Sequence, residues 1–408
     1  MNEVTHTYLL LLKSAIWNQA LPALVTADWT DNDWYELEQL ALRQGTAALV
    51  YDRLLSLEQS IPADMQSRMR GLCAMQMMRM PSQAALLDKV LKTLKEGDVR
   101  PVLLKGFGLA ALYPRPELRS WGDVDVFVGK DQYHQGAGLL RAAFPESVHH
   151  EVEWEALKHY NLIVKGGVIE MHRVSIKLDH PRDLRIYDRL EAEGTRPDRV
   201  ERIALPETHT EADIPWGPYN MLYTFMHAWT HFVDEGLGMK QVSDVSLLAR
   251  REYLQVCDNP SRQKGYHDYL LRAVNGLCLD EAWQLIGYVA VTCLDLPAEM
   301  WQGYWLGGEG NVCQRRWLRK HGPKFVERIM AEGMLRETHY GEGENRYTER
   351  EKNLRMPMLL RKLKTLYLAF GHARMIRPYS SRYARHIVAT ALWKGWRRLW
   401  HKEETVLY

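Results

Sequence analysis

Hydrophobic residues recur at helical spacing through the first part of the chain. In residues 5–94 the apolar positions follow one another mostly at intervals of three and four, as Trp34 and Leu37 do. This periodicity predicts about four helices. Asp31 or Asn32 stands just before one of these apolar stripes and is expected to cap its helix.

Near residue 100 the pattern changes to short runs that are typical of strands. Residues 101–104 include an apolar run, and residues 123–128 alternate aspartate or phenylalanine with valine. Two further apolar runs within residues 162–171 are separated by a turn that contains Gly166 and Gly167, which predicts a β-hairpin. Helical stretches lie between these runs, so this part is expected to form a small mixed sheet with helices.

Helical periodicity returns after Pro215 and continues to the end of the chain. The expected fold class is therefore α+β, with a small mixed β-sheet flanked by N- and C-terminal helical domains. The expected domains are residues 1–98, 99–206 and 207–408, and the last of these ends in a basic amphipathic tail.

Composition narrows the class of protein without naming a partner. The chain has 408 residues, of which 46% are hydrophobic and 25% charged, as in ordinary globular proteins. Its 53 basic and 51 acidic residues leave a net charge of +2, so any basic surface must be local. Five cysteines without a C-x-x-C pair, and the absence of a signal-peptide pattern or a membrane-length apolar run, favour a cytoplasmic protein.

Two aspartates carry the strongest chemical signal in the chain. Asp123 and Asp125 are two residues apart in a predicted strand, so both side chains should project from the same face. Paired carboxylates repel one another unless a cation lies between them, and Mg²⁺ prefers such oxygen ligands together with phosphate oxygens. A surface strand can also carry this spacing, so neighbouring residues must decide.

Several neighbouring residues favour a phosphate-binding site. Lys105 and Gly106 end one predicted strand and enter a helix, where backbone N–H groups can meet phosphates. Arg119 adds positive charge for a triphosphate. Glu170 supplies a third carboxylate at the end of a later strand, and His172 faces the same side, to orient an acid, touch substrate or make a structural hydrogen bond.

Together these residues resemble the uncharacterised bacterial nucleotidyltransferase family of the polymerase-beta superfamily. The resemblance rests on Lys105-Gly106, on the Gly-Asp-Val-Asp-Val segment that contains Asp123 and Asp125, and on Ile169-Glu-Met-His. It extends over roughly residues 5–250, because the Trp34 segment and the His227-x-x-x-His231 helix are also similar to that family.

The resemblance implies a Mg²⁺-dependent transfer of NMP from an NTP, such as ATP, to an acceptor hydroxyl. Asp123, Asp125 and Glu170 would be the catalytic metal ligands, for two Mg²⁺ ions or for Mn²⁺. Lys105 and Gly106 would take the place of the superfamily's small-residue phosphate turn, from which this chain departs. Arg119 and His172 complete the expected substrate-binding residues.

Two other functions remain open at this point. One is a toxin-like transferase that acts on tRNA or protein, with the basic C-terminal helix as its support. The other is a catalytically silent nucleotide-binding module, which the altered glycine turn permits.

Three further features have competing structural explanations. His227 and His231 share one helix face and are expected to pack the helical domain onto the core, with metal ligation as the alternative. Asp244 is expected to cap a helix or form a salt bridge. The tail is expected to be an amphipathic helix with packed tryptophans, with RNA or membrane-surface contact as the alternative. Its basic and aromatic residues are Arg374, Arg377, Arg382, Arg385, Trp393, Lys394, Trp396, Arg397, Arg398 and Trp400.

Overall fold

The structure is a computed structural model of the chain. The residues it describes are 2–21, 28–57, 61–147, 159–178, 180–301, 312–334, 369–371 and 373–400, with the backbone alone for 312–315 and 393–400.

A six-stranded mixed sheet lies at the centre of the predicted α/β part. Its strands are β1 (Val102–Leu103), β2 (Val124–Phe127), β3 (His159–Val164), β4 (Gly167–His172), β5 (Glu201–Ile203) and β6 (Ala212–Ile214). They lie in the order β3-β4-β2-β1-β6-β5. Strand β2 is parallel to β4 and β1 is parallel to β6, whereas the other neighbours are antiparallel. The predicted α+β class is confirmed.

The β3–β4 hairpin forms where the glycine turn predicts it. Val164 pairs with Gly167 across a two-residue connection, and Gly166 has φ +105°, which a side chain would strain. Strands β5 and β6 were not expected from the sequence, because each is only three residues long. Since β6 pairs with β1, the sheet extends beyond residue 206, the expected end of the second domain.

The N-terminal part consists of helices, as the apolar spacing predicts. They are α1 (Glu3–Trp17), α2 (Asp31–Arg43), α3 (Ala47–Leu55) and α4 (Ala63–Glu96). The predicted cap of α2 is wrong: Thr30 is the N-cap and forms a reciprocal capping box with Asp33. Threonine followed three residues later by a carboxylate satisfies both free N–H groups, which Asp31 or Asn32 would not do.

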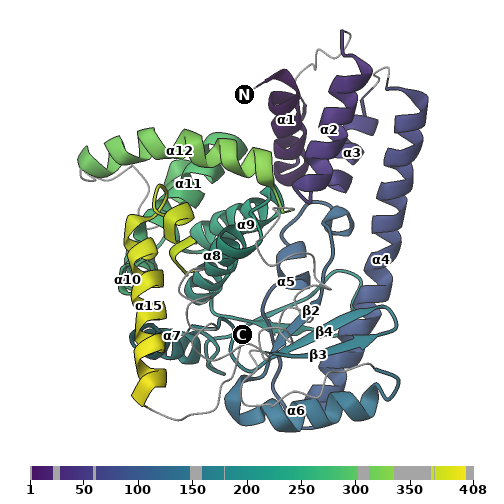
Figure 1. The fold of residues 1–408 in the computed structure, drawn as a ribbon. Helices are drawn as coiled ribbons and strands as arrows, with labels where there is room; N and C mark the ends of the chain where they lie inside the picture. Colours follow the sequence, from purple (N-terminus) through teal and green to yellow (C-terminus); the bar gives the residue numbers. More distant parts are fainter. Residues whose placement is uncertain are drawn as a thin grey trace.

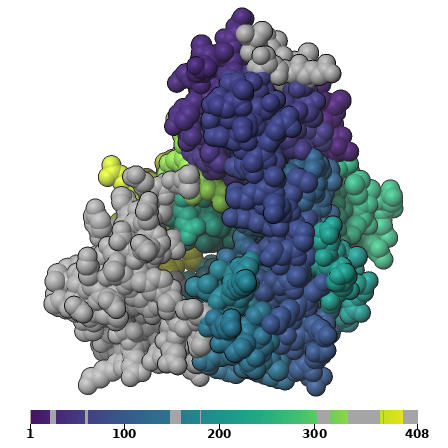
Figure 2. All heavy atoms as spheres, turned by 90° about the vertical axis from the view of Figure 1, so that its right-hand side faces the viewer, coloured from purple at the N-terminus to yellow at the C-terminus, as the bar shows by residue number. Residues whose placement is uncertain are grey.

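Helices also connect and follow the strands. They are α5 (Phe107–Ala110), η1 (Pro116–Leu118), α6 (Gly129–Ala143), α7 (Pro181–Gly194), α8 (Gly217–Asp234), α9 (Met239–Val256), α10 (Pro260–Gly276), α11 (Asp280–Leu294), η3 (Ala298–Met300), α12 (Val312–Glu332) and α15 (Ser381–Trp400). Figure 1 shows the long α4 beside the sheet, α6 below it, and α7 to α15 grouped on the other side of the molecule. Figure 2 shows the side that lies on the right in Figure 1, where α4, in blue, extends down from the purple N-terminal helices.

One hydrophobic cluster lies on each face of the sheet. The smaller cluster joins α4 and α6 to one face of the sheet through Val124, Val126, Ile169 and Met171. The larger cluster holds Phe127 from the other face together with residues of α1–α4, α8, α9 and α11. Apolar burial therefore holds the helical regions against opposite faces of the sheet.

The tail helix is present, and its first half packs on the bundle. Ala384 of α15 is buried, and the Tyr383 ring lies 5.8 Å from the ring of Trp229. Arg382 pairs with Asp280 at 3.2 Å, whereas Arg385 is exposed. The side chains of residues 393–400, including the three tryptophans, lie outside the described residues, so their role stays a prediction.

Within the part of the chain that the structure describes, no helix has the length and apolar character that a membrane crossing requires.

Candidate active site

The sheet face opposite α4 and α6 carries the predicted acidic residues. Strand alternation places Val124 and Val126 in the smaller cluster, so Asp125 between them projects to the other side. In the parallel pairing of β2 with β4, Asp125 lies directly beside Glu170, and Phe127 lies beside His172. The register of two strands therefore brings Asp125 and Glu170 together on one face.

Asp125 is a buried carboxylate with two partners on one oxygen. Its side chain is 2% exposed, Lys105 Nζ lies 3.1 Å from Oδ1, and His172 Nε2 lies 2.9 Å from the same atom. Burial alone raises the pKa of a carboxyl group, but Lys105 and His172 together hold the pKa of Asp125 below its ordinary value. Asp125 is therefore an anion at neutral pH.

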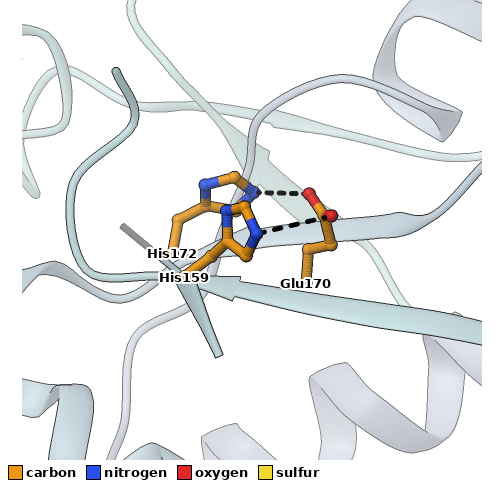
Figure 3. Close-up of side chains that lie close together, drawn as sticks. All are labelled: His159, Glu170 and His172. Carbon is orange, nitrogen blue, oxygen red and sulfur yellow. Dashed lines mark ion pairs between the residues drawn. The ribbon is translucent and has the colours of Figure 1, made fainter. Parts of the chain in front are cut away.

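Glu170 lies between two histidines (Figure 3). His159 Nε2 is 3.6 Å from Oε1, and His172 Nε2 is 3.5 Å from Oε2. Burial and the charge of Asp125 both raise the pKa of Glu170, yet its contacts with His172, His159 and Lys105 leave it lowered overall. His159 comes from β3, where it pairs with His172 of β4, so the hairpin register produces this arrangement.

Asp123 lies immediately before β2, at the exposed edge of the site. Its pKa is raised to about 6, first by partial desolvation and then by repulsion from Glu170 and Asp125. Three carboxylates thus lie close enough to destabilise one another's charge. Carboxylate oxygens that repel in this way are the ligands that a divalent cation such as Mg²⁺ takes, so the residues fit such an ion.

Lysines reach the same region from two elements. Lys105 follows β1, and the charges of Asp125, Glu170 and Asp123 raise its pKa despite its burial. Lys240 is in the first turn of α9, and burial together with repulsion from Arg119 and Lys105 lowers its pKa to about 8. Gly106 lies next to Lys105 with φ +59°, a backbone conformation that favours glycine at this turn.

One comparison with known protein families gives a match that covers most of the chain. A family model described as "Uncharacterised nucleotidyltransferase" matches residues 30–294, from the cap of α2 to the end of α11. The chain belongs to this family. No curated protein and no solved structure matches the chain. The predicted relationship to nucleotidyltransferases is confirmed, and the matched residues include the whole sheet together with α8 and α9.

The fold of this nucleotidyltransferase brings several residues to the site that the sequence does not predict there. His227 of α8 has its Nε2 atom 3.5 Å from Lys105 Nζ and 3.2 Å from His231 Nε2. The spacing of these two histidines favours packing, with metal ligation as the alternative, and neither explanation predicts the contact with Lys105. His159 and Lys240 carry no local motif, so no signal in the sequence alone points to them.

Arg119 has contacts other than the expected triphosphate. Its Nε and Nη2 atoms each donate to Asp244 at 2.8 Å, and the Tyr113 hydroxyl donates to the same carboxylate at 2.8 Å. Arg119 is 4% exposed. This buried pair joins the segment before β2 to α9, which fulfils the salt-bridge expectation for Asp244. Phosphate binding by Arg119 stays a prediction.

The structure describes two clusters of potential metal ligands. One consists of His159, Glu170 and His172, whose ligand atoms lie within 4.8 Å of one another. It overlaps the predicted metal site through Glu170 but contains neither aspartate. The other cluster lies elsewhere, at α7 and α15.

Proposed function

We propose that this nucleotidyltransferase transfers NMP from an NTP to an acceptor hydroxyl with the help of Mg²⁺. The observation that carries the proposal is the register of β2 and β4, which sets Asp125 beside Glu170 with Asp123 at the open edge. Membership in the family supports the transfer of a nucleotidyl group, and the three carboxylates support a divalent ion.

The carboxylates of Asp123, Asp125 and Glu170 would hold Mg²⁺, with two ions as the proposed number and Mn²⁺ as an alternative. When bound, the ions supply positive charge at the transferring phosphorus and at the departing pyrophosphate. His172 positions Asp125 through its 2.9 Å contact, so the metal-binding oxygens keep a fixed orientation.

The remaining residues act on the nucleotide and the acceptor. Lys105 and Lys240 place positive charge beside the acidic site, where the triphosphate is to lie, while Gly106 allows its backbone to approach closely. The acceptor oxygen forms a bond to the α-phosphorus as the bond to the bridging oxygen of pyrophosphate breaks. Glu170 takes the proton that the acceptor hydroxyl loses.

Asp125→Asn tests the proposal directly. The substitution keeps the size of the side chain but removes the charge that pairs with Lys105. We expect nucleotidyl transfer to fall on the order of a hundredfold or more, because charge stabilisation at the transferring phosphate is lost. The measurement is transfer of label from α-³²P-NTPs, with Mg²⁺, to a panel of small hydroxyl compounds, tRNA and protein.

Asp268→Asn provides the matched control, since Asp268 is a surface residue paired only to Lys264 and His267 in the described structure. This variant should transfer label like the unmodified chain. Equal transfer by Asp125→Asn and the unmodified chain would remove the proposed metal role.

A nucleotide-binding module without turnover is a second candidate, favoured by one observation. Lys105 Nζ contacts Asp125 at 3.1 Å, so a lysine charge can satisfy the carboxylate without a metal. Calorimetry with each NTP, with and without Mg²⁺, separates the two functions. Binding that is independent of Mg²⁺ and yields no labelled product would support the module; Mg²⁺-dependent binding with product would exclude it.

A further inference from the structure

A second cluster of ligand-type side chains joins α7 to α15, away from the acidic residues of β2 and β4. His180 immediately precedes α7, Asp183 is in the first turn of α7, and His386 is in α15. In Figure 1, α7 lies beside the lower part of α15. The start of α7 therefore contributes two ligand groups, and α15, far away in the sequence, contributes the third.

The three side chains converge closely. Their ligand atoms all lie within 4.8 Å of one another, and His386 Nε2 forms an ion pair with Asp183 Oδ2. The rings of His180 and His386 are 5.1 Å apart in an edge-to-face arrangement. The two imidazoles thus approach the same carboxylate from different elements.

Asp183 gives an independent reason to expect a ligand here. Asp183 is 4% exposed, and its Oδ1 atom is buried without a hydrogen-bond partner among the described residues. A carboxylate oxygen buried without a partner is costly. The ion pair with His386 uses only the other oxygen, so it leaves this cost in place.

We propose that His180, Asp183 and His386 bind a divalent transition metal of the zinc class. Two imidazole nitrogens and one carboxylate oxygen are a ligand set that zinc takes in proteins, with a fourth position left for water. The bound ion bridges α7 and α15 and so fastens the C-terminal helix to the body that carries the nucleotide site. An ion pair between His386 and Asp183, with His180 packed against it, is the competing explanation.

His180→Gln separates the two explanations because it removes a metal ligand and leaves the His386–Asp183 ion pair intact. The probe is Co²⁺, followed by its visible absorption, and then Zn²⁺, followed by the thermal unfolding temperature of the metal-stripped full chain. We expect His180→Gln to weaken Co²⁺ binding at one site by at least about tenfold, and to remove the corresponding part of the Zn²⁺-dependent rise in unfolding temperature.

His159→Gln is the matched control, because it removes a histidine from the other cluster, His159–Glu170–His172. It should leave the α7–α15 site unchanged. The proposal is overturned if the unmodified chain binds no Co²⁺ at micromolar concentration, or if His159→Gln removes all binding while His180→Gln removes none. His386→Ala should reproduce the loss seen with His180→Gln; its circular dichroism without metal shows whether it folds.

Discussion

At the scale of single residues, one carboxylate oxygen organises the candidate site. Asp125 Oδ1 has Lys105 Nζ at 3.1 Å and His172 Nε2 at 2.9 Å, and these contacts allow a charge to persist where water is excluded. At Asp123, partial desolvation and then repulsion from Glu170 and Asp125 outweigh the charges of Lys105 and Lys240, and its pKa rises to about 6. The site therefore combines one carboxylate that its partners stabilise, Asp125, with one that its surroundings destabilise, Asp123.

Lys240 leads to a prediction about pH. Its pKa is about 8, so its ammonium group loses its proton as pH rises through that value. If Lys240 meets the triphosphate, nucleotide binding should weaken between pH 7 and pH 9, and Lys240→Met should weaken it by about tenfold at pH 7. Calorimetry with a non-hydrolysable NTP across this range measures both effects.

Lys240→Arg is the control, because a guanidinium keeps its charge throughout that range. This variant should bind the nucleotide with an affinity that no longer falls above pH 8. The same fall in affinity with Arg at position 240 as with Lys would assign the pH dependence to another group.

At the scale of elements, the site depends on how α9 is held against the sheet. The buried Arg119–Asp244 pair and the Tyr113 hydroxyl connect the loop before β2 to α9, and Lys240 lies one helical turn before Asp244. Positioning of Lys240 at the acidic residues is therefore coupled to this buried contact. In this conformation Arg119 acts on the site indirectly, through its pair with Asp244 of α9.

Breaking that contact should destabilise the protein. Asp244→Asn leaves the Arg119 guanidinium buried without its counter-charge, so we expect the free energy of unfolding to fall by about 3–5 kcal/mol. Tyr113→Phe removes one hydrogen bond and should cost only about 1 kcal/mol. Urea unfolding measures both changes, and equal small effects would show that the pair is hydrated in solution.

At the scale of the whole molecule, one hydrophobic cluster runs through the N-terminal helices and the C-terminal bundle. Leu12 of α1 and Leu294 of α11 belong to it, and the Trp17 indole donates to the carbonyl of Leu294 at 2.5 Å. Lys13 also pairs with Asp295 at 2.7 Å. The N-terminal helices therefore share a core with the bundle, so their division into separate domains stays a prediction.

A shared core should unfold as one unit. Leu12→Ala removes a fully buried side chain and should lower the free energy of unfolding by about 2–5 kcal/mol. Leu254→Ala, at a side chain that is 53% exposed, should change it by at most about 0.5 kcal/mol. Tryptophan fluorescence and far-ultraviolet circular dichroism should give coincident urea transitions; separate transitions would indicate independent domains.

The sequence by itself determined the local features of this protein. Two apolar runs and the glycine turn between them predicted the hairpin, and the alternation of aspartate with valine predicted that Asp125 projects away from the valines, because these patterns depend only on neighbouring residues. The family resemblance likewise rested on short segments, and it was enough to place the chain among nucleotidyltransferases.

Only the tertiary structure decided which distant residues meet. Strand register brings His159 to Glu170, and the packing of α8 and α9 brings His227 to Lys105 and Lys240 to the acidic residues. Arg119 pairs with the buried Asp244. No spacing along the chain encodes such contacts. They arise because burial brings separate elements together, and charges buried with them must then find partners.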